Sequence, residues 1–228
     1  MPMNYSRQLD LANPAEYEDR EVTVIGAGGI GAGTTLALAK VGFARITVHD
    51  FDQLEAVNFP NQLLPVLHPS GDTWEGSDKV LALRWLVKVM TETEIQVGFE
   101  PFAHQPLSEI VILAVDNMVT RRLVWERAKE DPTVALFIDG RMARWNYQVY
   151  CLDLVKAREP QHRRYEATLF PDSEAAEIPC TEKATAPTNL RVAGTIAKLC
   201  VDWALGRPVP NVLLDVFEHW TQVVDTWT

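Results

Sequence analysis

The sequence predicts an α/β fold: a mostly parallel sheet with helices on both faces and antiparallel strands added near the C-terminus. Three observations support it. Short β-branched runs alternate with Ala- and Leu-rich helical segments, the pattern of a parallel sheet with crossover helices. A glycine-rich turn joins the first run directly to the first helix. The run 110–115 is apolar without alternation, as expected of a central strand covered on both faces.

The first strand–helix–strand unit has the strongest pattern. Residues 21–25 form a β-branched run that ends in glycines, so we expect a buried strand there. Residues 30–41 are rich in Ala and Leu, and Gly42 after them is typical of a helix C-terminus. The run 45–49 completes the unit as a second strand.

The next elements extend this sheet. Residues 50–76 are polar and contain prolines, so we expect them to be irregular. The helix predicted over 77–90 carries apolar side chains on one face. The remaining elements are predicted as strand 95–99, strand 110–115, helix 117–129, strand 134–138 and strand 148–154.

The alternation stops at 156–187, a stretch with scattered charge and little periodicity. Structureless segments of this length inside a domain are usually lids, binding loops or disordered links. After it, residues 189–205 are predicted to form a helix and residues 211–227 one or two strands. We therefore expect a single domain, 1–228, made of an N-terminal arm (1–20), a core (21–155), a crossover loop (156–187) and a C-terminal helix with strands (188–228).

Charge and cysteine content exclude several classes of protein. The chain has 228 residues, with 31 acidic against 21 basic side chains and a net charge of −10. Because nucleic acids and anionic membranes attract basic faces, neither is expected as the main partner. The three cysteines include no CxxC pair, so we expect neither a disulfide framework nor a zinc site. Without an apolar signal segment or membrane-length run, we expect a cytoplasmic protein.

The glycine-rich turn is the first candidate functional site. Residues 26–31 read GAGGIG, with Gly26, Gly28 and Gly31 at GxGxxG spacing, directly after a strand and at a helix start. Such glycines let backbone N–H groups approach a phosphate, and the helix N-terminus adds partial positive charge. Asp50 ends the second strand 24 residues after Gly26, where a carboxylate can accept hydrogen bonds from ribose hydroxyls. The loop alone leaves NAD and ATP open.

Further motifs discriminate between the two nucleotides. Five occur in order: Tyr5-Ser6-Arg7-Gln8; the loop with Gly26, Gly28, Gly29 and Gly31; Asp50-Phe51-Asp52-Gln53-Leu54 with Asn58 and Gln62; Gly76-Ser77-Asp78-Lys79; and Asp116-Asn117-Met118-Val119-Thr120-Arg121. In this order they resemble the ubiquitin-activating-enzyme family, the adenylyltransferases of the ThiF, MoeB and HesA type. Lys79 and Arg7 would have no role in a dehydrogenase, so ATP is favoured over NAD.

The resemblance implies a Rossmann-like adenylation domain in which residues 21–155 bind ATP and Mg²⁺. Lys79 would neutralise phosphate charge, Asp116 would hold the metal, and Arg7 would reach the ATP of a partner subunit, which implies a homodimer. Asp50 and Asn58 would hold the ribose. The expected cofactor-binding set is Gly26, Gly28, Gly29, Gly31, Asp50, Asp52, Asn58, Gln62 and Lys79.

The same resemblance implies the substrate and partners. The reaction would adenylate the C-terminal carboxylate of a ubiquitin-like or sulfur-carrier protein, and a conjugating-enzyme-like protein would be a further partner. Two alternatives stay open: adenylation of a peptide or another small carboxylate, and a non-catalytic nucleotide-binding interaction module. An NAD-dependent dehydrogenase is the most distant alternative.

The chain departs from the family pattern at two places. Asn61 stands where the family has an arginine that touches the ATP phosphates, so one charge-assisted contact is missing. Arg141 and Arg144 are the candidates to replace it. Asp139-Gly140-Arg141-Met142 also differs from the small-residue segment that the family has there. Together with the missing CxxC pairs, these departures indicate a divergent bacterial or phage-type branch without the structural zinc.

A cysteine in the predicted crossover loop is a candidate nucleophile. Pro179-Cys180-Thr181 resembles the Cys-Thr context of family members that pass their substrate to a thioester, and Lys183 close by would lower the thiol pKa. The alternative is an inert loop cysteine. Cys151, in an alternating strand, and Cys200, on the apolar face of the last helix, are predicted to be core thiols.

Overall fold

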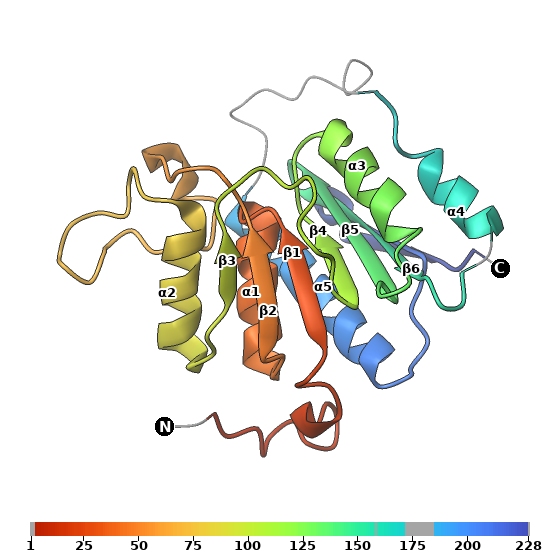
Figure 1. The fold of residues 1–228 in the computed structure, drawn as a ribbon, viewed down its shortest axis with the longest axis horizontal. Helices are drawn as coiled ribbons and strands as arrows, with labels where there is room; N and C mark the ends of the chain where they lie inside the picture. Colours follow the sequence, from red (N-terminus) through yellow and green to blue (C-terminus); the bar gives the residue numbers. More distant parts are fainter. Residues whose placement is uncertain (1–2, 158, 172–184, 228) are drawn as a thin grey trace.

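The computed structural model describes residues 3–157, 159–171 and 185–227, and its strands form one eight-stranded sheet (Figure 1). The strand order is β3-β2-β1-β4-β5-β6-β7-β8. The strands are β1 Glu21–Ile25, β2 Arg45–His49, β3 Gln96–Gly98, β4 Ile110–Leu113, β5 Leu136–Ala143, β6 Asn146–Asp153, β7 Val212–Val216 and β8 Thr221–Asp225. The helices are α1 Gly29–Val41, α2 Lys79–Thr91, α3 Met118–Ala128, α4 Glu159–Glu166 and α5 Ala186–Ala204.

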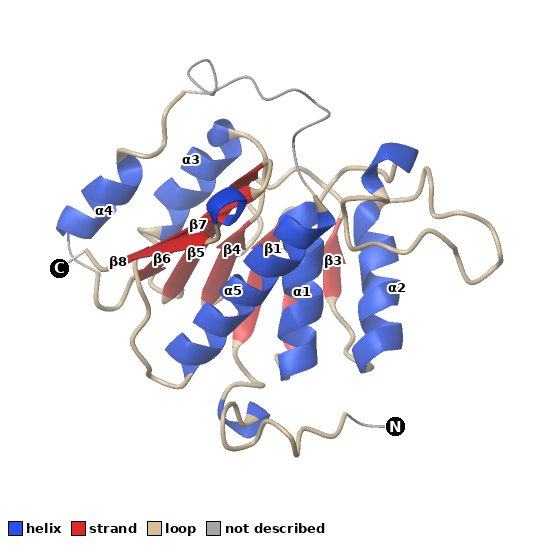
Figure 2. Ribbon diagram, turned by 180° about the vertical axis from the view of Figure 1, so that it is seen from behind, coloured by secondary structure: helices blue, strands red, loops and turns tan. Residues whose placement is uncertain are grey.

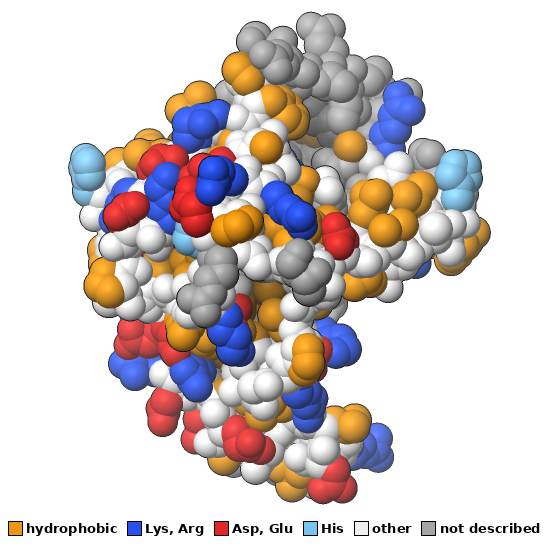
Figure 3. Space-filling model, turned by 90° about the vertical axis from the view of Figure 1, so that its right-hand side faces the viewer, with side chains coloured by type: hydrophobic (Ala, Val, Ile, Leu, Met, Phe, Trp, Pro, Cys, Tyr) orange, Lys and Arg blue, Asp and Glu red, His pale blue; other side chains and the backbone are white. Residues whose placement is uncertain are grey.

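The sheet has a parallel and an antiparallel half. β3, β2, β1, β4 and β5 pair in parallel, whereas β6, β7 and β8 are added antiparallel to β5 and to one another. This confirms the predicted fold class. β8 forms the edge of the antiparallel half, and all five of its residues are exposed. On the side of the molecule that faces the viewer in Figure 3, acidic and basic side chains are interspersed with hydrophobic ones.

Alternating side chains bury the sheet on both faces. In β4, Ile110 and Ile112 pack into one hydrophobic cluster with residues of α1, α2 and α5, whereas Val111 and Leu113 pack into a second cluster with residues of α3 and α4. Figure 2 shows α1, α2 and α5 in front of the sheet. This two-sided burial explains why the β4 sequence is continuously apolar rather than alternating.

The glycines of α1 permit its close packing. A Cβ at Gly33 would lie 3.0 Å from the Cβ of Ala193 on α5, so the two helices approach closely at this point. Gly42, at φ 115°, ends α1 in the left-handed conformation and donates its N–H to the carbonyl of Leu38. The predicted glycine C-terminus of this helix is thereby confirmed.

Two segments differ from the sequence predictions. The strand predicted over 134–138 extends to Ala143 and pairs with β6 over eight residues, through a tight turn with Arg144 at φ 56°. The predicted crossover loop, 156–187, contains α4, and α5 begins at Ala186 rather than at residue 189. α4 was not predicted because it buries only Tyr165 and therefore lacks an apolar periodicity.

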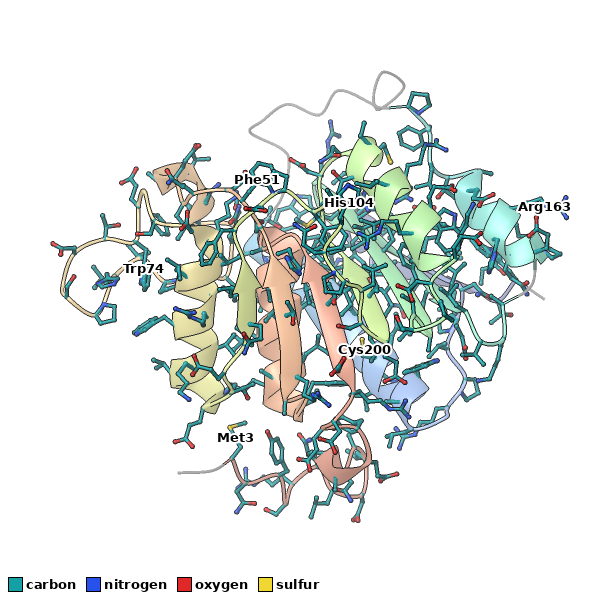
Figure 4. The ribbon with its side chains drawn as sticks, viewed as in Figure 1. Met3, Phe51, Trp74, His104, Arg163 and Cys200 are labelled. Atoms are coloured by element: carbon teal, nitrogen blue, oxygen red, sulfur yellow. The ribbon has the colours of Figure 1, made fainter. Side chains whose placement is uncertain are left out.

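The N-terminal arm lies at the end of the sheet opposite the glycine loop. The Gln8 side-chain amide and the Tyr17 hydroxyl both donate to the carbonyl of Val41, the last residue of α1, at 2.9 and 2.8 Å. Figure 4 shows Met3 at this lower end and Phe51 and His104 near the upper edge. None of the helices in the described ranges has both the length and the apolar character needed to cross a membrane.

A candidate nucleotide site at the carboxyl edge of the sheet

The glycine loop lies where β1 and β4 end, and steric contacts explain its glycines. Gly26 has a φ of 99°, and a Cβ there would lie 2.5 Å from the carbonyl oxygen of Ala114. A Cβ at Gly31 would lie 1.8 Å from the carbonyl oxygen of Gly26. A Cβ at Gly28 would meet nothing within 4 Å, so there is open space over this residue. The loop is therefore tight toward the sheet and open outward, as a phosphate-binding turn requires.

The start of α1 provides backbone donors beside this open space. Gly28 is the N-cap residue, and no side chain caps the helix there. The first N–H groups of a helix have no partner within the helix, and the helix dipole places partial positive charge on them. An anionic phosphate would satisfy both conditions.

Asp50 connects the loop to the end of β2. Its Oδ2 accepts from the Ala27 N–H at 2.6 Å and its Oδ1 from the Asp52 N–H at 2.8 Å. Burial raises the pKa of this carboxyl, and the two backbone hydrogen bonds oppose the increase. A carboxylate oxygen has more than one lone pair, so each oxygen retains capacity to accept a ribose hydroxyl.

Lys79, the first residue of α2, pairs with Asp52 across the same edge. Its Nζ lies 2.7 Å from Asp52 Oδ2, and its backbone N–H donates to the Asp52 carbonyl at 3.0 Å. The Lys79 side chain is 9% exposed and that of Asp52 51% exposed. The amine is thus held at a fixed position by a carboxylate that remains open to solvent, and an incoming phosphate can compete for it.

Asp116 follows β4 and is exposed at the same edge. Asn117 beside it caps α3 by accepting from the Thr120 N–H at 2.8 Å, which fixes the start of the helix. Among the described residues, no group of three or more His, Cys, Asp and Glu side chains could hold a metal ion. Mg²⁺ in nucleotide sites is usually bound through one or two carboxylates plus phosphates and water, so a single Asp116 fits that ion when ATP accompanies it.

Asn58 and Gln62 occupy the turn after this edge. The Asn58 Oδ1 accepts from the Glu55 N–H at 2.9 Å and so stabilises the short 3-10 helix Ala56–Asn58. The Gln62 Oε1 is buried and has no hydrogen-bond partner within the described part of the chain. The ribose contact expected of Asn58 and the nucleotide contact expected of Gln62 stay predictions.

No motif or spacing pointed to Asn189, which the structure places against the glycine loop. This residue of α5 is fully buried, and its side-chain nitrogen donates to the backbone carbonyl of Asn61. A Cβ at Gly29 would lie 2.6 Å from that nitrogen. Asn189 therefore links α5, the loop and the turn that contains Asn61. Asparagine is common near helix starts, so its position in the sequence alone did not predict a contact with the glycine loop.

Arg141 has a different role from the one expected. Its guanidinium donates to Asp139 and to the carbonyl and hydroxyl oxygens of Thr168, and it stacks 4.6 Å above the Tyr150 ring. The interpretation that Arg141 replaces the missing phosphate-binding arginine is therefore not supported by its contacts. The backbone carbonyl of Arg144 accepts from the Thr188 hydroxyl at 3.2 Å.

The remaining candidates lie away from this edge or outside the described residues. Arg7 is exposed on the N-terminal arm, and α1, with 13 residues at 1.5 Å each, separates it from its own glycine loop by about 20 Å. Cys180 lies outside the described residues. Cys151 and Cys200 are buried core thiols, as predicted, and burial raises the pKa of both.

Comparison with known proteins identifies the family. The sequence pattern of the ThiF family matches residues 5–222. The chain belongs to the ThiF family. Among curated relatives of this ThiF chain, the adenylyltransferase and sulfurtransferase MOCS3 of Anopheles gambiae is 29% identical over 161 residues, which cover 63% of the chain and 35% of MOCS3. The probable adenylyltransferase/sulfurtransferase MoeZ of Mycobacterium tuberculosis (strain ATCC 25618 / H37Rv) is 31% identical over 134 residues, 54% of the chain and 33% of MoeZ. The matches span about a third of these relatives' length.

Solved structures share the fold of this ThiF chain. The E. coli MccB structure with ATP superposes with a TM-score of 0.70 at 14% identity, over 93% of the chain and 64% of MccB. The PaaA structure superposes with a TM-score of 0.72 at 16% identity, over 93% of the chain and 65% of PaaA. At these identities the likeness establishes the fold alone.

Proposed function

We propose that this ThiF-family chain is an adenylyltransferase that uses Mg·ATP to activate a carboxylate. The observation that carries the proposal is the Lys79–Asp52 pair, a buried amine whose 2.7 Å partner is half exposed, at the edge that also holds the open glycine loop. A fixed lysine at that position suits the phosphates of ATP. The names of the MOCS3 and MoeZ relatives, both adenylyltransferases, support the same reaction.

In this reaction the substrate carboxylate attacks the α-phosphorus of ATP, the bond to the β-phosphate breaks, and acyl-AMP and pyrophosphate form. The backbone donors of the glycine loop hold phosphate oxygens, and Asp50 orients the ribose. Lys79 exchanges Asp52 for phosphate oxygens and offsets the repulsion between two anions. Asp116 would hold Mg²⁺, which shares the charge of the phosphates and of the leaving pyrophosphate.

The proposed substrate is the C-terminal carboxylate of a ubiquitin-like or sulfur-carrier protein. The sulfurtransferase part of the MOCS3 and MoeZ names supports a sulfur-carrier pathway. In a second step, the Cys180 thiolate would attack the acyl carbon and release AMP, leaving a thioester. Because Arg7 lies at the end of α1 opposite its own loop, an ATP that Arg7 contacts would belong to a second copy, and a homodimer follows.

Isotope exchange tests the reaction. We expect Mg·ATP to exchange with labelled pyrophosphate when a sulfur-carrier protein with a free C-terminus is present, and not when the same carrier is amidated at that end. Lys79→Ala should slow the exchange about 100-fold, as loss of a charge-stabilising donor typically does. Absence of exchange with the free carrier, or full exchange in Lys79→Ala, would contradict the proposal. A short peptide acid tests the second candidate substrate, for which the MccB structure solved with AMPCPP and MccA is the precedent.

A non-reducing gel tests the thioester separately. We expect wild-type protein with carrier and Mg·ATP to give a conjugate that dithiothreitol removes, and Cys180→Ala to lose the conjugate while keeping the exchange. A conjugate that persists in Cys180→Ala would exclude Cys180 as the acceptor without affecting the adenylation proposal.

A further inference from the structure

A buried carboxylate, Asp139 on β5, joins three elements on the α3 and α4 face of the sheet. It is fully buried and accepts from the guanidinium groups of Arg121 on α3 and Arg141 on β5, and from the Tyr165 hydroxyl on α4 at 3.0 Å. Its two oxygens divide these partners: Arg121 donates to Oδ1, whereas Arg141 and Tyr165 donate to Oδ2. Oδ1 therefore connects β5 to α3, and Oδ2 connects it to α4.

The Oδ1 side leads to the edge where Asp116 lies. Besides Asp139, Arg121 donates to the backbone carbonyl of Val115, the residue before Asp116, and to the carbonyl of Gly140 at 3.3 Å. Arg121 is 5% exposed, and burial together with the charge of Arg141 lowers its pKa to about 10. The charge of Asp116 opposes that decrease in pKa.

The Oδ2 side leads to the end of α4. Arg141 donates at 3.0 Å to both the carbonyl and the hydroxyl of Thr168, and it lies above the rings of Tyr150 and Tyr165. The Thr168 hydroxyl in turn donates to the carbonyl of Tyr165 at 2.7 Å. The planar fork of an arginine and its stacking on aromatic rings cannot be reproduced by lysine. Residue 168 is therefore fixed to β5 by contacts that only arginine can make.

Burying the charges of this cluster carries a desolvation penalty. A buried guanidinium, Arg121, and a largely buried one, Arg141, share one buried carboxylate. Buried ion clusters of this kind often contribute less stability than apolar side chains of the same volume. Packing alone does not require charged residues at these positions. A fixed geometry between the Asp116 edge and the end of α4 explains them.

We propose that Asp139, Arg121 and Arg141 form a positioning clamp that couples the placement of the proposed metal-binding carboxylate, Asp116, to the placement of Thr168. Through Val115, Arg121 sets where the chain leaves β4. Through Thr168, Arg141 sets where the chain leaves α4. The inference rests on the proposed function, because it concerns how the site holds Mg²⁺ with ATP.

Calorimetry of ATP binding with excess Mg²⁺ and with EDTA tests the clamp. The readout is the ratio of the two affinities, the Mg²⁺ stimulation. Asp116→Asn should abolish most of it. Residues that hold a metal ligand in place typically contribute about 10–100-fold to metal affinity. Arg141 lies one contact further away, so we expect Arg141→Lys to lower the Mg²⁺ stimulation about 5-fold. The ATP affinity measured in EDTA should change little. If Arg141→Lys fails to fold, Thr168→Val replaces it in the test. This substitution removes the hydroxyl that accepts from Arg141, so it should also lower the Mg²⁺ stimulation.

Arg122 provides the matched control. It also anchors the end of α4, by donating to the Leu169 carbonyl, but no contact with Asp139 accompanies this among the described residues. Arg122→Lys should therefore keep the wild-type Mg²⁺ stimulation. Wild-type stimulation in both Arg141→Lys and Thr168→Val, or an equal loss in Arg122→Lys, would overturn the clamp alone. Failure of the wild type to bind ATP in either medium would overturn the proposed function, and the clamp with it.

Discussion

Two cation–carboxylate groups lie at the carboxyl edge of the same sheet, and they differ in burial. In the first, Lys79 faces Asp52, which is 51% exposed. In the second, Arg121 and Arg141 share Asp139, whose side chain is fully buried. We call these the open pair and the closed cluster. The open pair lies beside the glycine loop, and the closed cluster lies behind Asp116.

Exposure decides what each group can do. Water competes for the Asp52 carboxylate, so the open pair contributes little to stability and its amine can be transferred to a phosphate. In the closed cluster the Asp139 carboxylate is shielded from water, and removing one partner leaves an uncompensated buried charge. Ligand binding therefore suits the open pair, and fixed geometry suits the closed cluster. The following substitutions test this division, from the largest expected effect to the smallest.

The largest effect is expected from Asp139→Ala. It leaves the buried guanidinium of Arg121 and the largely buried one of Arg141 without a carboxylate, and breaking such buried groups typically costs about 3–5 kcal/mol. We expect the free energy of unfolding, measured by urea denaturation, to fall by that amount, with Asp52→Ala as the control at about 1 kcal/mol or less. Equal losses in the two variants would contradict the distinction between the groups.

Lys79→Ala should have the opposite combination of effects, a large loss of activity and a small loss of stability. The loss of one charged donor from the phosphate site should slow pyrophosphate exchange about 100-fold. The free energy of unfolding should fall by about 1 kcal/mol or less, because the partner carboxylate is half exposed. Pyrophosphate exchange and denaturation of the same preparation measure both quantities. If Lys79→Ala lost several kcal/mol of stability yet retained pyrophosphate exchange, Lys79 would be a structural residue rather than a phosphate-binding one.

Asn189→Ala tests whether the link between α5 and the loop belongs with the closed contacts. The substitution leaves the buried Asn61 carbonyl without its donor, and an unsatisfied buried acceptor costs about 1–3 kcal/mol. We expect a loss of that size in urea denaturation. Asn189→Asp keeps the shape and exchanges the donating nitrogen for an oxygen, so stability as high as the wild type in this variant would refute the hydrogen bond to Asn61.

His49 gives the smallest effect and depends on pH. It is 8% exposed, its Nδ1 has no partner within the described chain, and burial lowers its pKa. Because the unfolded imidazole binds a proton more readily than the folded one, stability should fall as the pH drops below about 6.5. The His49→Phe variant should lose part of this dependence. Identical pH profiles of the unfolding free energy in the two proteins would show that His49 carries no such penalty.

The fold class was predicted from sequence, and Lys79 and Asp52 were named as site residues, but neither their pairing nor the closed cluster was predicted. The βα turn follows from local spacing, whereas Lys79 and Asp116 were named because their motifs resemble those of the family; Lys79 lies at the start of a helix and Asp116 just after a strand. Asp139 was noticed only as a departure, since its meaning depends on Tyr165 and Thr168, which lie 26 and 29 residues later, on or just after a helix without apolar periodicity. Asn189 meets Asn61 across 128 residues. Contacts between distant segments leave no spacing signal in a single sequence.

The central claim is that the open edge binds Mg·ATP through Lys79. Calorimetric titration of the wild type and of Lys79→Ala with Mg·ATP and with NAD tests it most directly. We expect Mg·ATP to bind the wild type and to bind Lys79→Ala at least about 10-fold more weakly, because a charged contact is lost. We expect NAD to bind neither protein. Binding of NAD, or equal Mg·ATP affinity in the two proteins, would contradict it.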